Sequence, residues 1–291
     1  MRLRVLALAS VVAFLGAACT TAPPGEPGPT SPTPAPAVAL VKIAYFEDLS
    51  PEGATAWTAP AFQGARLAID TAGLADPLPV AVELVAFDTK GSSEDAAAVA
   101  SEVAADPAYV AGIGAPFLTG QLALGRILDP AGVPMITLST LGPKLARSGW
   151  TTWRRAVANE QEQGDGIKDE TFLSVAGGSG VGMVATCPCA DLSASTELRA
   201  QRFIQDYQAD FGLPPGPYSA EALDVTRMIL RAIREGATTR GGVLAALAAS
   251  DPFEGLANTY AFRSDGELAP EAAHVRLCRD EGGRWIPLPG L

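Results

Sequence analysis

The sequence predicts an α/β protein built on a doubly wound parallel sheet. After residue 38, short apolar segments typical of strands alternate with segments whose apolar residues recur at helical spacing. In the segment from 79 to 87, apolar residues occupy both the odd and the even positions, which is expected of a strand covered on both faces. A composition with 48% hydrophobic and 18% charged residues is that of a globular protein. Helices are therefore expected on both sides of the sheet.

Each element follows from its local pattern. Phe62, Ala65 and Ile69 share one face of the first helix, and Ser92 and Asp95 are placed to cap the second. The expected strands span 41–46, 79–87, 109–113 and 133–139. The expected helices span 60–72, 93–105 and 119–128.

Charge and composition exclude several functions. The chain has 21 Lys+Arg against 32 Asp+Glu, so its formal net charge is −11, and no basic stripe is present to bind nucleic acid or an anionic membrane surface. One histidine, His274, leaves little room for nucleophile–histidine catalysis or a His-rich metal site. The sequence also contains no cofactor fingerprint, so we expect neither an enzyme nor a cofactor.

The first residues have the pattern of an export signal. Arg2 and Arg4 precede an apolar run over 5–18, which is short for a membrane span and ends in small residues before Cys19. A cysteine at this place resembles the bacterial lipoprotein site, so we expect a signal peptide over 1–18 and lipidation of Cys19. Ordinary cleavage near Ala18 is the alternative. Residues 19–38 form a Pro-rich linker, suited to lifting a domain off a membrane.

Ligands of doubly wound sheets bind beyond the carboxyl ends of the strands. The residues expected there are 47–57, Asp88, 114–120 and 139–142. Thr119, at the expected start of a helix, suits a ligand carboxylate, and Trp57 suits an apolar substituent. The alternatives are a simple N-cap for Thr119 and core packing for Trp57. We interpret Glu47 and Asp48 as part of a solvated loop.

The order of these segments resembles the leucine/isoleucine/valine-binding proteins, the type I solute-binding proteins of ABC importers. The segments that carry the resemblance are Phe62–Ala68, Gly112–Phe117, Ala131–Ile136, Asp165–Ile167 with Phe172–Gly178, and Phe203–Gly212 with Pro214, Pro215 and Tyr218. The similarity covers 39–288 and implies a type I periplasmic-binding-protein-like fold. It also implies an exported, membrane-anchored protein that delivers an amino acid of branched-chain type, or a similar small polar molecule, to an ABC transporter permease.

The resemblance implies a set of ligand contacts. Thr119 keeps a hydroxyl that the family uses, Leu118 replaces another, and Ser139 contacts ligand through its backbone. Leu141 stands where the family commonly has Thr. Trp57 matches a family aromatic near the ligand side chain, and Asp165 matches an acidic residue that holds the ligand ammonium group.

The second lobe of the family is shortened in this sequence. Residues 39–158 and 192–271 are assigned to lobe one, and 159–191 and 272–291 to a truncated lobe two. About ninety residues, or three βαβ units, are missing between Gly164 and Asp165. Closure around a ligand requires two surfaces. The alternative function is therefore a ligand-dead family remnant that acts as a protein-interaction or sensor lipoprotein.

Three cysteines follow Cys19. In an exported protein we expect a disulfide from Cys187 or Cys189 to Cys278, with one thiol left over. Unpaired thiols are an alternative, and a zinc site formed by these cysteines with His274 is another. We expect no metal.

Overall fold

The computed structural model describes residues 39–49, 58–74, 76–163, 170–248, 251–272 and 275–288. All of them belong to the unit that spans 38–291. The expected signal peptide and linker, together with Cys19, Trp57, Asp165 and His274, lie outside the described residues.

The main sheet has five parallel strands in the order β2-β1-β3-β4-β5. They are β1 (Leu40–Glu47), β2 (Ala81–Asp88), β3 (Tyr109–Ile113), β4 (Met135–Thr137) and β5 (Trp153–Arg155). This order is doubly wound, as the sequence predicts, with the direction of winding reversing between β1 and β3. The fourth strand is shorter than predicted, and the local sequence pattern does not predict β5.

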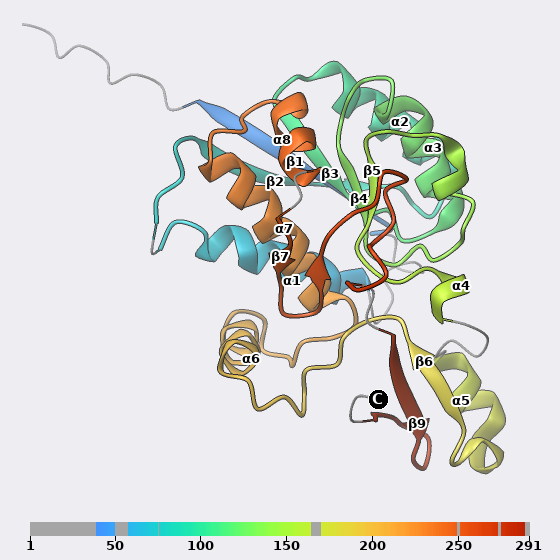
Figure 1. Cartoon of the computed structure of the whole chain (residues 1–291). Helices are drawn as coiled ribbons and strands as arrows, with labels where there is room; N and C mark the ends of the chain where they lie inside the picture. Colours follow the sequence, from blue (N-terminus) through green and yellow to red (C-terminus); the bar gives the residue numbers. More distant parts are fainter. Residues whose placement is uncertain are drawn as a thin grey trace, which may run out of the picture. The chain divides into compact units, whose positions relative to one another are not determined.

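Helices cover both faces of this sheet (Figure 1). The helices α1 (Thr58–Thr71), α7 (Ser219–Arg234) and α8 (Arg240–Leu247) cover one face, and α2 (Ser93–Ala105) and α3 (Leu118–Leu128) cover the other. The pleat of β1 explains this division, because Ile43 and Tyr45 enter one hydrophobic core while Ala44 and Phe46 enter the other. Because β1 is buried on both faces, neither of its two alternating sets of side chains faces solvent.

The second helix begins where the sequence predicts. The Ser92 hydroxyl accepts hydrogen bonds from the backbone N–H groups of Glu94 and Asp95, at 3.1 and 3.3 Å. The Asp95 carboxylate forms an ion pair with Lys90 at 2.9 Å. Ser92 thus provides the expected cap of α2.

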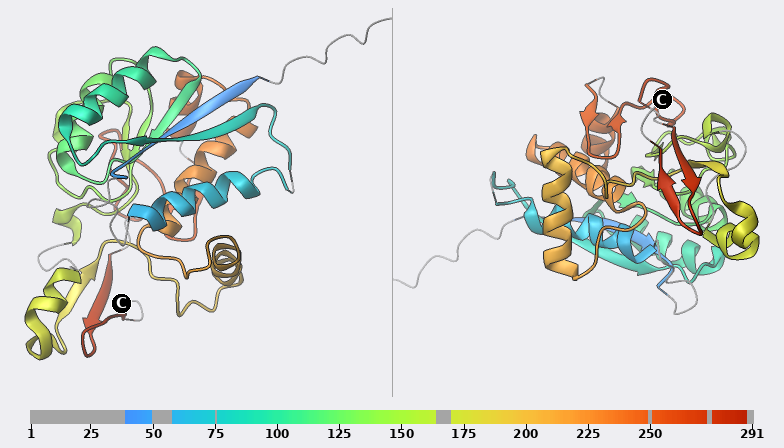
Figure 2. Two further views of the ribbon diagram at one scale, coloured as in Figure 1. Left: turned by 180° about the vertical axis from the view of Figure 1, so that it is seen from behind. Right: turned by 90° about the horizontal axis from the view of Figure 1, so that it is seen from below.

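A second, antiparallel sheet has the order β10-β9-β6. Its strands are β6 (Val184–Cys187), β9 (Arg276–Asp280) and β10 (Trp285–Pro287), and α5 (Glu170–Ala176) accompanies them (Figure 2). Leu173, Ala185 and Trp285 form its small core with two cysteines. A disulfide joins Cys187 to Cys278, across 91 positions of sequence, with their Cα atoms 5.9 Å apart. Cys189 is buried and lies outside this bond.

The remaining elements lie between those already described along the chain. They are η1 (Ala146–Ser148), α4 (Glu160–Gln163), η2 (Gly177–Gly180), α6 (Leu198–Phe211) and the hairpin β7 (Phe253–Glu254) with β8 (Thr259–Tyr260).

Candidate functional site

The candidate site lies at the carboxyl ends of β1, β3 and β4, where the winding of the main sheet reverses. The loop after β3 passes closely over the end of β1. Gly114 has a φ of 99°, and a Cβ at this position would clash with the carbonyl oxygen of Phe46. Only glycine fits both requirements, so the sequence Gly-Ala-Pro after β3 permits this close approach.

Hydrogen bonds fix the β3 loop to its neighbours. The backbone N–H of Ala115 donates to the side chain of Gln121 on α3 at 2.7 Å. The Thr140 hydroxyl donates to the Ala115 carbonyl at 3.2 Å, and the Ser139 hydroxyl donates to the Pro116 carbonyl at 3.3 Å. The loops after β3 and β4 therefore form one connected surface at the strand ends.

A small cavity of about 10 Å³ opens on this surface. It is lined by the ends of β1 and β4, the β3 loop and the first residues of α1 and α7, through Tyr45, Phe46, Glu47, Thr58, Ala61, Gly114, Ala115, Pro116, Leu138, Ser139 and Tyr218. A space of this size holds one water or one polar group of similar volume. A whole amino acid would place a single group in it and lie across its mouth.

Glu47 is the charged residue of this cavity lining. It is the last residue of β1 and is 3% exposed, and the neighbouring Asp48 is 5% exposed. The sequence-based interpretation of these two residues as a solvated loop is therefore wrong. Burial raises the pKa of Glu47 to about 8, and the negative charge of Asp48 acts in the same direction, against the lowering effect of a backbone hydrogen bond.

Two hydroxyl-bearing residues at helix starts complete the cavity walls. Thr58 is the first residue of α1, and Tyr218 stands at the N-cap of α7 with a φ of 60°. Both are buried, and burial raises the pKa of Tyr218 well above its usual value. The sequence pattern predicts no ligand role for Thr58 or Tyr218. The one feature that could have indicated such a role is their position at the start of a helix.

The residues predicted to bind ligand occupy different places. Ser139 lines the cavity, whereas Leu118, Thr119 and Leu141 do not. Leu118 lies close to Gly142, which brings the β3 and β4 loops together, and Leu141 packs against the core. Trp57 and Asp165 lie outside the described residues. The ligand roles of all six residues remain predictions.

Thr119 does not cap α3. The helix begins at Leu118 with Phe117 at the N-cap, and no side chain caps it. Thr119 lies one residue inside the helix and is exposed. The N-cap alternative is therefore wrong, because the helix starts one residue earlier than the sequence pattern predicted. The first N–H groups of α3 stay available to acceptors from solvent or ligand.

A buried ion pair supports the loop after β4. Arg155 on β5 and Glu267 are 0% and 2% exposed and pair through bonds of 2.8 and 3.2 Å. The same guanidinium donates to the carbonyl of Thr140 and, at 2.8 Å, to that of Gly142. It also lies over the Trp153 ring, 5.0 Å from the centroid. One side chain thus ties the loop that carries Ser139 to the edge of the sheet.

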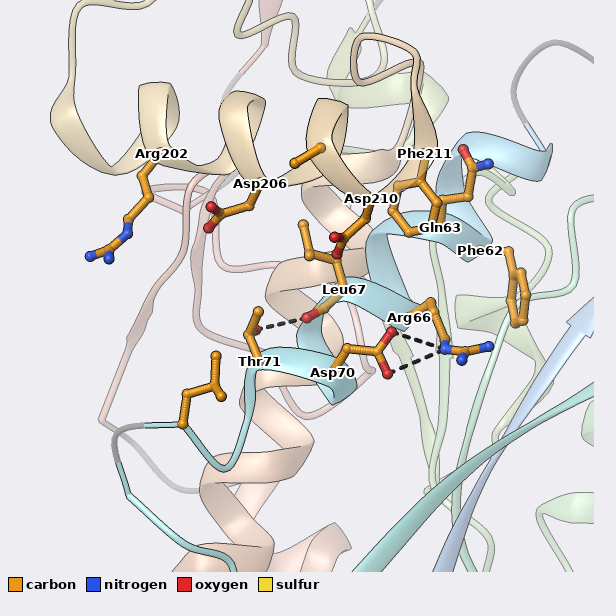
Figure 3. A pocket seen from close by; sticks show the side chains of 12 residues that line it. Phe62, Gln63, Arg66, Leu67, Asp70, Thr71, Arg202, Asp206, Asp210 and Phe211 are labelled. Carbon is orange, nitrogen blue, oxygen red and sulfur yellow. Dashed lines mark hydrogen bonds and ion pairs between the residues drawn. The ribbon is translucent and has the colours of Figure 1, made fainter.

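A larger groove, of about 900 Å³, lies between α1 and α6, away from the strand ends (Figure 3). Its floor includes Leu67 and Phe211, and its rim carries charged side chains. Arg66 pairs with Asp70 along α1 at 3.0 Å. All its lining residues belong to the two helices or follow α1, so no strand end contributes to it.

Two properties of the described residues bear on the other predictions. Within the described residues, no helix is long and apolar enough to cross a membrane, and no group of three His, Cys, Asp or Glu side chains is placed to hold a metal ion. The disulfide uses two of the thiolates that the zinc alternative requires.

Solved structures share this architecture. A leucine-bound ABC transporter substrate-binding protein from Desulfitobacterium hafniense is 17% identical, with a TM-score of 0.71 over 86% of this chain and 99% of that one. A leucine-binding protein from Thermotoga maritima is 18% identical, with a TM-score of 0.69 over 86% and 98%. The chain has the type I periplasmic-binding-protein fold. The five-stranded sheet lies within the residues predicted to form lobe one, and the three-stranded sheet lies within those predicted to form the truncated lobe two. The division into lobes stays a prediction.

The same fold accepts more than one class of ligand. A solute-binding protein from Rhodopseudomonas palustris in complex with 3,4-dihydroxybenzoic acid is 12% identical, with a TM-score of 0.67 over 87% of this chain and 97% of that one. No family model and no curated protein matches the sequence. The type I periplasmic-binding-protein fold therefore leaves ligand chemistry to the side chains at the strand ends.

Proposed function

We propose that this protein is an extracytoplasmic solute-binding lipoprotein of an ABC importer. It binds an amino acid of branched-chain type, or a similar small polar molecule, and delivers it to the transporter permease without chemistry of its own. The observation that carries the proposal is the hydroxyl-lined cavity at the winding reversal of a type I periplasmic-binding-protein fold. This is the place where open α/β sheets bind ligands.

The proposed ligand pose uses both lobes. The carboxylate faces the first turn of α3, where N–H groups without helical partners and the Thr119 hydroxyl favour negative charge. Ser139 contributes through its backbone, Leu118 and Leu141 contact apolar parts, and Trp57 covers the side chain. Asp165 approaches the ligand from the second lobe.

A thermal-shift screen of the purified protein against the twenty standard L-amino acids tests this function. A ligand at about 100 times its Kd stabilises the folded state by about 2.7 kcal/mol, which raises Tm by several degrees in a protein of this size. Thr119→Ala and Asp165→Ala are expected to abolish the shift. A protein that melts cooperatively and responds to no amino acid would contradict the proposal.

Membrane anchoring has its own test. We propose that the signal peptide over 1–18 is removed and that Cys19 is lipidated, so that the linker over 19–38 tethers the folded unit. Metabolic labelling with an alkyne fatty acid is expected to mark the wild type and not Cys19→Ser. Equal labelling of both would contradict the anchor.

A second function is favoured by the reduced lobe. Its sheet has three strands, and Val175, Val181 and Met183 around it are exposed. A lobe of this size offers little surface for closing on a solute, and exposed apolar side chains suit a protein partner. The alternative is therefore a ligand-dead lipoprotein that acts in protein interaction or sensing, and a negative amino-acid screen would favour it.

A further inference from the structure

We propose that the cavity at the end of β1 is an ammonium-binding subsite and that the carboxylate of Glu47 is its anion. The inference rests on the proposed solute-binding function and names the chemical group that this side of the site recognises. Its solute is a primary amine, and the amine enters the first lobe.

The first argument is the contrast between Glu47 and two other buried carboxylates, Glu267 and Asp224. Buried Glu221 and Asp280 also have one oxygen without a hydrogen-bond partner among the described residues, but neither lines this cavity. Glu267 is held by two bonds from Arg155, and Asp224 accepts from the N–H groups of Leu256 and Ala257 and from the hydroxyl of Tyr260. Each of them holds a segment of the fold in place.

Glu47 has no such structural task. Its Oε1 accepts one bond of 3.2 Å from the backbone N–H of the adjacent Asp48. Within the part of the chain that the structure describes, Oε2 has no hydrogen-bond donor and the side chain has no ion pair. Because burial raises the pKa of Glu47 to about 8, most of this group is protonated at pH 7, and its charged form is stabilised only when a cation enters beside it.

The second argument is the cavity itself. Glu47 lines a space of about 10 Å³, which is the room that one water molecule or one ammonium group needs. Hydroxyl-bearing Thr58, Ser139 and Tyr218 stand around it. An ammonium group has three N–H donors, so it suits a site lined by a carboxylate and oxygen-bearing groups.

The third argument is charge. The lining residues include no Lys, Arg or His, and the charge next to Glu47 is that of Asp48, which is also buried. Among the described residues that line the cavity, the other titratable groups are Tyr45 and Tyr218, whose pKa values burial raises, so both stay neutral near pH 7. The local potential therefore favours a cation and disfavours a ligand carboxylate at this point.

The subsite also places the two charged groups of the ligand at different points of the proposed site. With the ammonium group in the cavity, the ligand carboxylate is free to lie toward the first turn of α3. Asp165, which the family resemblance assigns to the ammonium, then faces an amine that the first lobe already holds. Binding to the first lobe becomes possible before the reduced second lobe contributes.

The test uses calorimetry on the purified protein with three probes. They are L-leucine, 4-methylpentanoate, which lacks the amine, and 3-methylbutylamine, which lacks the carboxylate. We expect L-leucine and 3-methylbutylamine to bind and 4-methylpentanoate to bind at least tenfold more weakly than L-leucine. Glu47→Gln is expected to weaken binding of both amines at least tenfold, whereas Glu47→Asp retains part of it.

A second readout separates charge pairing from packing. The raised pKa of Glu47 means that most of this group is protonated near pH 7, so an amine must displace that proton. Titration in two buffers with different ionisation enthalpies is expected to show proton release in the wild type and none in Glu47→Gln. Glu83→Gln, an exposed carboxylate on β2, is the matched control and is expected to bind as the wild type does.

Folding does not obscure the result. Because Glu47 is mostly protonated near pH 7, the neutral Glu47→Gln substitution is expected to leave the urea midpoint close to that of the wild type. A well-folded variant with weak amine binding supports the subsite.

The outcomes distinguish the subsite from the proposed function. If amino acids bind equally to wild type and Glu47→Gln, the subsite is overturned while the solute-binding function stands. If 3-methylbutylamine alone binds, the subsite stands and the amino-acid ligand is wrong. Absence of binding by every probe, or equal displacement of the amines by K⁺ at constant ionic strength, overturns the ammonium assignment.

Discussion

The ion pair between Arg155 and Glu267 makes a sharp prediction about stability. Both side chains are almost fully buried, and four hydrogen bonds from the guanidinium reach Glu267 and the carbonyls of Thr140 and Gly142. Arg155→Met leaves the Glu267 charge buried without its cation, which costs about 3–5 kcal/mol. The two carbonyls lose their donor as well, at about 1–3 kcal/mol each where water cannot replace it.

A double-mutant cycle apportions this cost. Glu267→Met alone is also expected to cost about 3–5 kcal/mol, because it strands the guanidinium. The double variant removes both charges and is expected to be more stable than Arg155→Met. Urea unfolding followed by tryptophan fluorescence suits the measurement, since Trp153 lies against the guanidinium.

The segment that carries Glu267 also supplies the control. Arg263 and Asp265 form an ion pair at 2.6 Å, but both side chains are about 40% exposed. Arg263→Met is expected to cost no more than about 1 kcal/mol, because exposed pairs contribute little. If Arg155→Met costs as little as Arg263→Met, or if the two buried substitutions simply add, the buried pair does not support the β4 loop.

Three further predictions concern stability. Replacing Cys187 and Cys278 by Ala opens a loop of 91 positions, for which chain entropy gives a loss of about 4.6 kcal/mol in the unfolding free energy, measurable by urea titration. Gly64→Ala is expected to lower Tm by several degrees in a thermal melt, because its Cβ would clash with the Ser219 carbonyl where α1 meets α7, whereas Gly73→Ala, in open space, should not. Burial raises the pKa of Glu221 to about 7, so the folded state binds more protons than the unfolded state between about pH 4.5 and 7. The unfolding free energy should therefore fall as pH rises through that window, and Glu221→Gln should flatten the fall.

The regular first lobe could be predicted because its patterns are local. The segment 93–105 has a capping serine and an Ala-rich face, and the helix forms over those residues. The strand over 109–113 is buried throughout and also has the predicted bounds. Where a segment buries charge, local pattern fails. The strand β5, Trp153–Arg155, contains two arginines, and it is a strand because Glu267, 112 positions away, neutralises one of them.

The sequence predicts where the candidate site lies, but it does not predict the burial of the charged residue that lines it. Strand order fixes where the loops after β3 and β4 meet, so Ser139 and Gly114 were expected at the site. The sequence pattern predicts that Glu47 is solvated, because two polar residues at the end of a strand usually begin a loop. Its burial depends on Gly114, whose lack of a side chain lets the β3 loop close over β1, and on the starts of α1 and α7.

Fold likeness alone does not identify the solute. Structures similar to this chain hold leucine in one case and 3,4-dihydroxybenzoic acid in another, and the second ligand has no amine. An acid without an amine gains no charge pairing at Glu47, which burial keeps mostly protonated at pH 7 and which repels the acid once ionised. A primary amine, by contrast, stabilises the ionised form of Glu47 in the complex. The residue at the end of β1 therefore discriminates between these two ligand classes more directly than the similarity of the whole chain does.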